Sequence, residues 1–150
     1  MLAACTSDGT PQSSRTFDPC VPVTVGAPDA SDAQRTSIAA AIEMWHAAGL
    51  AAPSDSGAAE PTIVIRFESA APAIFGLYDD ATIHINIELD GAARSITIAH
   101  ELGHAFGLVH VPIGERASVM NAGNLTIAPA GDDLAPLAAI WGACDAGLHD

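Results

Sequence analysis

The sequence has no lysine and little charge of any kind apart from its acids. Five basic residues, all arginine, stand against 18 acidic residues, which gives a formal net charge of −13. A surface of this sign repels phosphate backbones and anionic headgroups, which argues against nucleic-acid partners and against direct binding to a membrane surface. The apolar runs are interrupted by proline, glycine or charge within about a dozen residues, too few for a transmembrane helix.

Charged residues make up only 15% of the chain, whereas hydrophobic residues make up 49%. That balance excludes a disordered chain, and the length suits a single domain with one core. Strand-like and helix-like apolar patterns alternate, which predicts a mixed α and β fold. Helices are expected over residues 29–49, 92–106 and 131–144, strands over 20–26, 62–69 and on both sides of a turn at 79–80, and a loop over 52–61.

The three cysteines show no C-x-x-C spacing, which argues against a zinc knuckle built from thiolates. Cys20 precedes the first predicted strand, and Cys144 closes the last predicted helix. Because the two ends of a domain often lie close together, we expect a Cys20–Cys144 disulfide if the chain folds in an oxidising compartment.

A different role is indicated for Cys5. The segment from Leu2 to Cys5 reads LAAC, which resembles the lipobox of bacterial lipoproteins, whose cysteine becomes the lipidated N-terminus. The polar residues that follow have the composition of a flexible tether. We therefore expect a flexible leader and candidate lipoprotein tether over residues 1–18, and one domain over residues 19–150. The alternative is a chance match of four residues.

Three of the six histidines lie in one short segment, AHELGHAFGLVH. His100 and His104 are four residues apart, so on a helix their rings project from the same face and can hold one metal ion. Glu101 lies beside that ion rather than on it, where its carboxylate can accept a proton from a metal-bound water.

Gly107 and His110 complete this pattern. Glycine accepts the positive φ that a sharp reversal after the helix requires, and such a turn can bring His110 back as a third ligand. Three neutral imidazoles leave the fourth tetrahedral position for water, as in hydrolytic zinc sites. The segment therefore predicts one catalytic Zn2+ ion.

The pattern HExxHxxGxxH, followed ten residues after His110 by Met120 in SVM, resembles that of the metzincin metallopeptidases. In that family the methionine forms an apolar floor beneath the metal, which implies this role for Met120. The likeness is greatest to the matrixins and small bacterial matrixin-like proteins, over roughly residues 20–145. It implies a zincin-like α+β fold, with a small mixed twisted sheet of about four strands packed on two long helices, and a C-terminal helix after the methionine turn.

Two departures limit the resemblance. Ala122 stands where some metzincins have a tyrosine near the metal, so no tyrosine helper is implied. The loop rich in histidine and aspartate that holds a structural zinc in matrix metalloproteinases is missing. Cys20, in DPCVPV, also resembles the propeptide cysteine that caps the zinc in matrixins, but its place before the first strand favours the disulfide.

The residues and the resemblance together predict a zinc-dependent metalloendopeptidase in which Glu101 is the general base. An extended peptide is expected to pair with an edge strand around Gly76 and Leu77. The resemblance implies that Asn121 and Ala122 line the pocket for the first primed residue. We expect a monomer that a bacterium exports and that acts on peptides or proteins. Two alternatives stay open: a catalytically silent zinc-binding surface lipoprotein, and a zinc amidohydrolase acting on non-peptide amides.

The remaining polar residues give weaker indications of a binding site. Asp79 with Asp80, and Asp132 with Asp133, are candidate calcium ligands, but neither pair fits an EF-hand, and adjacent acids are typical of solvated turns. His84, in TIHIN, has no aspartate or histidine partner nearby in the sequence and is expected to be an outward-facing strand residue.

Overall fold

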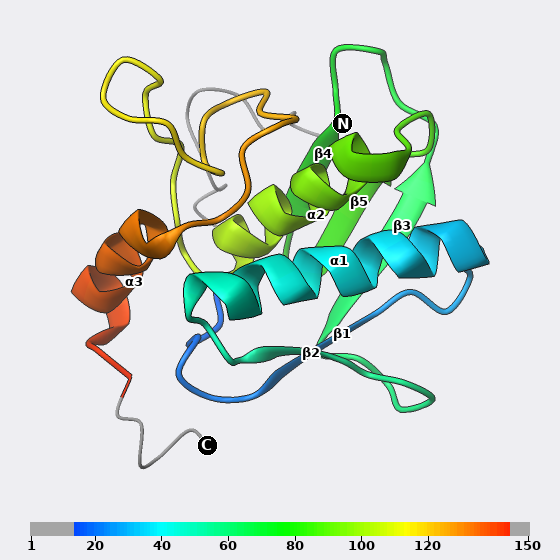
Figure 1. Cartoon of the computed structure of the whole chain (residues 1–150). Helices are drawn as coiled ribbons and strands as arrows, with labels where there is room; N and C mark the ends of the chain where they lie inside the picture. Colours follow the sequence, from blue (N-terminus) through cyan, green and yellow to red (C-terminus); the bar gives the residue numbers. More distant parts are fainter. Residues whose placement is uncertain (1–13, 145–150) are drawn as a thin grey trace.

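Figure 1 shows an α+β fold in which the two long helices lie side by side over one face of a twisted sheet. This computed structural model describes residues 14–144. The elements in chain order are β1 (Val23–Gly26), α1 (Asp32–Ala48), β2 (Pro53–Asp55), β3 (Ile63–Glu68), β4 (Gly76–Asp79), β5 (Thr82–Asn86), α2 (Gly91–Ala105), the short 3-10 helix η1 (Gly131–Asp133) and α3 (Leu134–Trp141). The mixed α and β character predicted from the sequence is confirmed.

The strands form one sheet in the order β2-β1-β3-β5-β4. β1 is parallel to β2 and β3, and β3 is parallel to β5, whereas β4 runs antiparallel to β5. In the turn between β4 and β5, Asp80 and Ala81 both have positive φ, 43° and 69°, as a tight hairpin turn of type I′ requires. The hairpin leaves β4 as the outermost strand at one edge of the sheet.

The core lies between the sheet and the two long helices. Ile83 and Ile85 of β5 are completely buried, whereas His84 between them is only half-buried, as the two-residue period of a strand requires. Trp45 of α1 is also completely buried, and its indole N–H donates to the carbonyl oxygen of Ala99 in α2 at 3.0 Å. α1 thus fixes the position of the helix that carries the histidine motif.

Two segments differ from the sequence-based expectations. The loop predicted at 52–61 contains β2, which pairs with β1, so the sheet has five strands rather than about four. A three-residue strand is too short to show an alternating apolar pattern, which is why the sequence did not reveal it. Residues 14–18 were assigned to the leader but pack on the domain, where the N–H of Phe17 donates to the carbonyl of Ala105 at 2.8 Å.

A disulfide joins Cys20 to Cys144, as predicted, across 124 residues of sequence. It connects the segment before β1 to the residues after α3, and closing a loop of this length stabilises the fold by up to about 5 kcal/mol. Cys20 is therefore no free thiolate, and the alternative of a zinc-capping cysteine is wrong. Cys5 lies outside the described residues. Within residues 14–144, no helix is long and apolar enough to cross a membrane.

Candidate metal centre

α2 lies in the interior of the fold, where every residue from Arg94 to Ala105 is buried. Arg94, Ser95 and Thr97 are polar residues of the first turns of this segment, and further along the helix His100, Glu101 and His104 are polar and at most 5% exposed. Buried imidazole and carboxylate groups destabilise a fold unless each makes specific contacts. The three residues therefore mark the functional part of the helix.

The end of α2 positions the third histidine. Gly107 has a φ of +100°, and the N–H groups of Gly107 and Leu108 both donate back into the last turn of the helix at 2.9 Å. This is a Schellman turn, which reverses the chain directly after the helix. His110 returns toward α2 as a result, and the ring centroids of His100 and His110 are 5.2 Å apart.

The three imidazoles converge through their Nε2 atoms. The Nε2 of His110 lies 3.3 Å from the Nε2 of His100 and 3.3 Å from the Nε2 of His104. One ligand atom from each ring lies within 4.8 Å of the others, and within residues 14–144 no other group of three His, Cys, Asp or Glu side chains gathers in this way. The structure thus brings together the histidines that the sequence pattern selects.

Backbone carbonyls orient two of the rings. The Nδ1 of His100 lies 2.6 Å from the carbonyl oxygen of Val119, and the Nδ1 of His104 lies 2.8 Å from that of Leu108. A carbonyl oxygen can only accept, so each Nδ1 carries the proton and donates it, and the lone pair is on Nε2. This is the tautomer in which histidine binds a metal through Nε2.

Both helical histidines are held neutral. Burial lowers the pKa of His100 to about 4, a shift that the hydrogen bond to Val119 partly opposes and that His110 increases. Burial, with further contributions from His100 and His110, lowers the pKa of His104 to about 3. Histidine must be neutral to bind a metal, so both rings are in the required state at neutral pH.

The donor set fits a divalent metal. Three neutral imidazoles with converging lone pairs repel one another unless a proton or a cation lies between them. Nitrogen ligands from three histidines are typical of catalytic zinc, which keeps a fourth position open. In the part of the chain that the structure describes, no fourth His, Cys, Asp or Glu joins the group.

Glu101 lies at the wall of a cleft beside the histidines. A cavity of about 130 Å³ is lined by residues leading into β4 (Ala73–Gly76), by Thr97, His100 and Glu101 of α2, and by Gly123 and Asn124. A Cβ placed on Gly76 would lie 3.1 Å from Cγ and 3.2 Å from Oε1 of Glu101. The start of β4 can approach the carboxylate this closely because Gly76 has no side chain. Leu77, the next residue of the strand, is buried.

Met120 lies against the helix that carries the ligands. It is 1% exposed, and a Cβ placed on Gly103 of α2 would overlap its sulfur. Gly103 directly precedes His104, so the thioether packs next to the candidate metal ligands. An apolar floor at this position is what the sequence resemblance implies for Met120.

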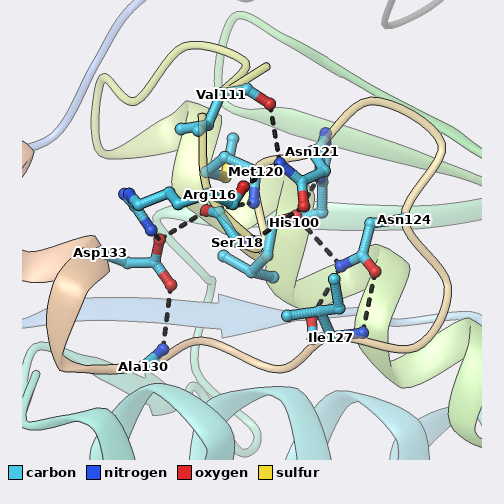
Figure 2. A network of polar contacts seen from close by, with 11 residues as sticks. His100, Val111, Arg116, Ser118, Met120, Asn121, Asn124, Ile127, Ala130 and Asp133 are labelled. Atoms are coloured by element: carbon cyan, nitrogen blue, oxygen red, sulfur yellow. Dashed lines mark hydrogen bonds and ion pairs between the residues drawn. The ribbon is translucent and has the colours of Figure 1, made fainter. Parts of the chain in front are cut away.

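The turn that carries Met120 is held by a buried polar network (Figure 2). Asp133 is 1% exposed and accepts from the Ser118 hydroxyl at 2.6 Å and from the Arg116 guanidinium at 2.9 Å. The Ser118 oxygen in turn accepts from the N–H of Met120 at 2.9 Å. Sequence reasoning missed this network, because these residues share no regular spacing and meet only through the folded loop.

Asn121 and Ala122, which were predicted to line the pocket for the first primed residue, are not among the residues that line this cavity, and their role stays a prediction. The Asn121 amide is used inside the turn, where its Nδ2 donates to the carbonyl of Val111 at 2.8 Å, and Ala122 is exposed. Gly123 and Asn124 line the cavity instead.

The other predicted polar clusters have local partners. Asp80 lies in the hairpin turn and pairs with Arg15 at 3.6 Å, and Asp133 pairs with Arg116 at 2.9 Å. His84 does have an acidic partner, which the sequence did not indicate: its Nδ1 lies 2.5 Å from a carboxylate oxygen of Glu68, on the neighbouring strand β3. The partner is remote in sequence and becomes a neighbour only through the pairing of β3 with β5.

No protein-family model matches the sequence, and no curated protein matches it. Among the solved structures that do match is the crystal structure of myroilysin, with 16% sequence identity and a TM-score of 0.49. The match covers 96% of this chain and 74% of the myroilysin chain.

Proposed function

We propose that this chain is a zinc-dependent metalloendopeptidase. The observation that carries the proposal is the convergence of three imidazoles on one point, beside a buried carboxylate at the wall of a cleft. A structural zinc site is normally closed by four protein ligands, whereas a three-histidine site leaves room for water and substrate. The donor set therefore favours hydrolysis over a purely structural role.

His100, His104 and His110 would hold the metal through Nε2. Zinc bound there supplies a Lewis acid that polarises a carbonyl group and lowers the pKa of water towards neutrality. The carbonyl oxygens of Val119 and Leu108 keep the two helical rings oriented and increase the basicity of their Nε2 atoms.

Glu101 is the residue that moves the proton. Its carboxylate accepts a proton from the water that attacks the peptide carbonyl carbon, and it delivers this proton to the amine nitrogen as the carbon–nitrogen bond breaks. The residue is 1% exposed and lines the cleft, so the transfer takes place at a site largely shielded from bulk water.

The substrate is a peptide that lies extended along β4. This strand is outermost in the sheet, and Gly76 at its start forms part of the cleft wall. An edge strand offers backbone N–H and C=O groups to an extended chain, and Gly76 and Leu77 are proposed to be central to this pairing. Recognition of backbone groups rather than of a terminal amine favours cleavage within a chain.

We also propose that the enzyme is exported and acts as a monomer. The disulfide between Cys20 and Cys144 favours folding in an oxidising compartment. Lipidation at Cys5 remains a prediction from the sequence, with a membrane partner only through that anchor. Peptides or proteins outside the cytoplasm are the proposed substrates.

The proposal is tested by metal analysis of the purified chain and by digestion of a mixed peptide library, with and without a chelator. We expect stoichiometric zinc and cleavage that the chelator abolishes and added zinc restores. Glu101→Gln keeps the shape of the side chain but removes the base, so cleavage should fall by about 10²- to 10⁴-fold while zinc stays bound. The matched control is Glu115→Gln, which changes an exposed carboxyl group on the loop after His110.

Each alternative has its own outcome in this experiment. Full zinc occupancy without cleavage of any peptide would favour the silent zinc-binding protein. Turnover of small non-peptide amides alone would favour the amidohydrolase. Peptide cleavage that survives unchanged in Glu101→Gln would refute the role given to that residue.

A further inference from the structure

We propose that Asn124 is a positioning residue for the metal centre, because its side-chain amide holds the Val119 carbonyl that orients His100. The inference rests on the proposed function, but it concerns a residue that neither binds the metal nor moves the proton. Asn124 lies four residues beyond Met120, at the point where the turn meets the cleft (Figure 2).

The carbonyl oxygen of Val119 receives two donors. The Nδ1–H of His100 donates to it at 2.6 Å, and the Nδ2 of Asn124 donates to it at 3.2 Å. A carbonyl oxygen has two lone pairs, so two donors hold its direction more firmly than one. Val119 is completely buried, which shields this oxygen from water that could replace a lost donor.

The direction of the Asn124 amide is set by its other contacts. Its Oδ1 accepts the N–H groups of Thr126 at 3.1 Å and Ile127 at 2.8 Å, and its Nδ2 also donates to the Ile127 carbonyl at 2.7 Å. An oxygen must face the two N–H groups, so the amide cannot be turned over without loss of these bonds. The same side chain thus closes the loop over residues 124–127 and directs its N–H toward Val119.

Asn124 also connects the turn to the surface on which a peptide would lie. It lines the cavity together with Glu101 and His100. Asn121, the other asparagine of the turn, donates to the carbonyls of Val111 and Arg116 instead. Only Asn124 therefore joins the cleft wall to the hydrogen bond of a metal ligand.

The test compares Asn124→Ala with Asn124→Asp. Aspartate keeps the two acceptor bonds to the N–H groups of Thr126 and Ile127, but at neutral pH it can donate neither to Val119 nor to the Ile127 carbonyl. If loop closure were the only task of Asn124, both variants would keep the zinc affinity and the cobalt spectrum of the wild type. The control is Thr126→Ala, because only the backbone N–H of this exposed residue contributes to the contacts of Asn124.

Two measurements report on the metal centre independently of cleavage. Zinc affinity is measured by competition with a coloured chelator, and the visible spectrum of the cobalt(II)-substituted protein reports ligand geometry. We expect both Asn124 variants to bind zinc roughly tenfold more weakly than the wild type, with an altered cobalt spectrum. For the aspartate variant this opposes the electrostatic trend, since an added negative charge attracts a divalent cation.

The outcomes separate this inference from the proposed function. If the wild type binds zinc and both variants have the same zinc affinity and cobalt spectrum as the wild type, the inference alone is overturned. It is also overturned if zinc affinity falls in Asn124→Ala but is at the wild-type level in Asn124→Asp. A wild-type chain that binds neither zinc nor cobalt would overturn both. Thermal unfolding of the metal-free proteins shows whether each variant folds, and if Asn124→Ala does not, Asn124→Asp decides the question because it keeps the two acceptor bonds to Thr126 and Ile127.

Discussion

Replacing Gly103 by alanine adds one methyl group at the point where α2 meets Met120. The new Cβ would overlap the Met120 sulfur and lie 3.3 Å from its terminal methyl carbon and 3.5 Å from Cδ1 of Leu108. Met120 is 1% exposed, so it cannot swing into solvent to make room. Either the methionine turn or the helix must shift.

Two opposing effects decide whether Gly103→Ala raises or lowers the free energy of unfolding. Alanine is favoured over glycine in a helix interior by about 1 kcal/mol, which would stabilise the variant. Inserting a methyl group into a packed core destabilises by about 1–3 kcal/mol, and an overlap this severe belongs in the upper part of that range. We expect a net loss of about 1–2 kcal/mol, which corresponds to a fall in Tm of roughly 3–6 °C for a chain of this size.

The assay is thermal unfolding of the metal-free and zinc-loaded proteins, combined with zinc competition. Zinc affinity should also fall, because Val119, the residue before Met120, orients His100 through its carbonyl. Gly114→Ala is the control, since a Cβ there meets nothing within 4 Å. A Gly103→Ala protein that is more stable than the wild type and binds zinc equally well would refute the close packing of Met120 on α2.

Two further predictions concern the cleft and the histidines. Gly76→Ala should reduce cleavage by at least about tenfold with zinc still bound, because the new Cβ would lie 2.9 Å from Cγ2 of Thr97 and 3.1 Å from Cγ of Glu101 and would crowd both side chains. Steady-state kinetics with metal analysis checks this, and unchanged kinetics would contradict it. Metal-free protein should lose stability as the pH falls from about 6.5 toward 4, because the unfolded chain takes up protons that the buried His100 and His104 do not. The difference between 6.5 and about 4 is worth about 3 kcal/mol for His100 alone, so the slope of urea-derived unfolding free energy against pH should be smaller in His100→Asn. Equal slopes would show that His100 is not held neutral by burial.

The parts of the candidate metal centre that depend on residues close together in the sequence could be predicted. His100 and His104 share a helix face because of the 3.6-residue period, and the Gly107 turn needs only the positive φ that glycine accepts. His110 follows from that turn within three residues. These relations depend on short stretches of backbone, which the sequence specifies directly.

The hydrogen bonds that hold the loop around the candidate metal centre could not be predicted in this way. Asp133 reaches Ser118 across an irregular loop, and Asn124 reaches Val119 through a turn with no periodic pattern. β2 is likewise defined by its neighbour β1 rather than by its own residues, so composition indicated a loop. Such contacts depend on the path of the whole chain, and spacing along the sequence does not reveal them.

The bond between Cys20 and Cys144 turns most of the molecule into one covalent ring. A single internal cut in an exposed segment, such as residues 112–115, would therefore leave both pieces attached to each other. The nicked molecule would gain only the mass of one water and would separate into fragments only after reduction. Self-digestion in a purified sample would thus escape notice on a non-reducing gel.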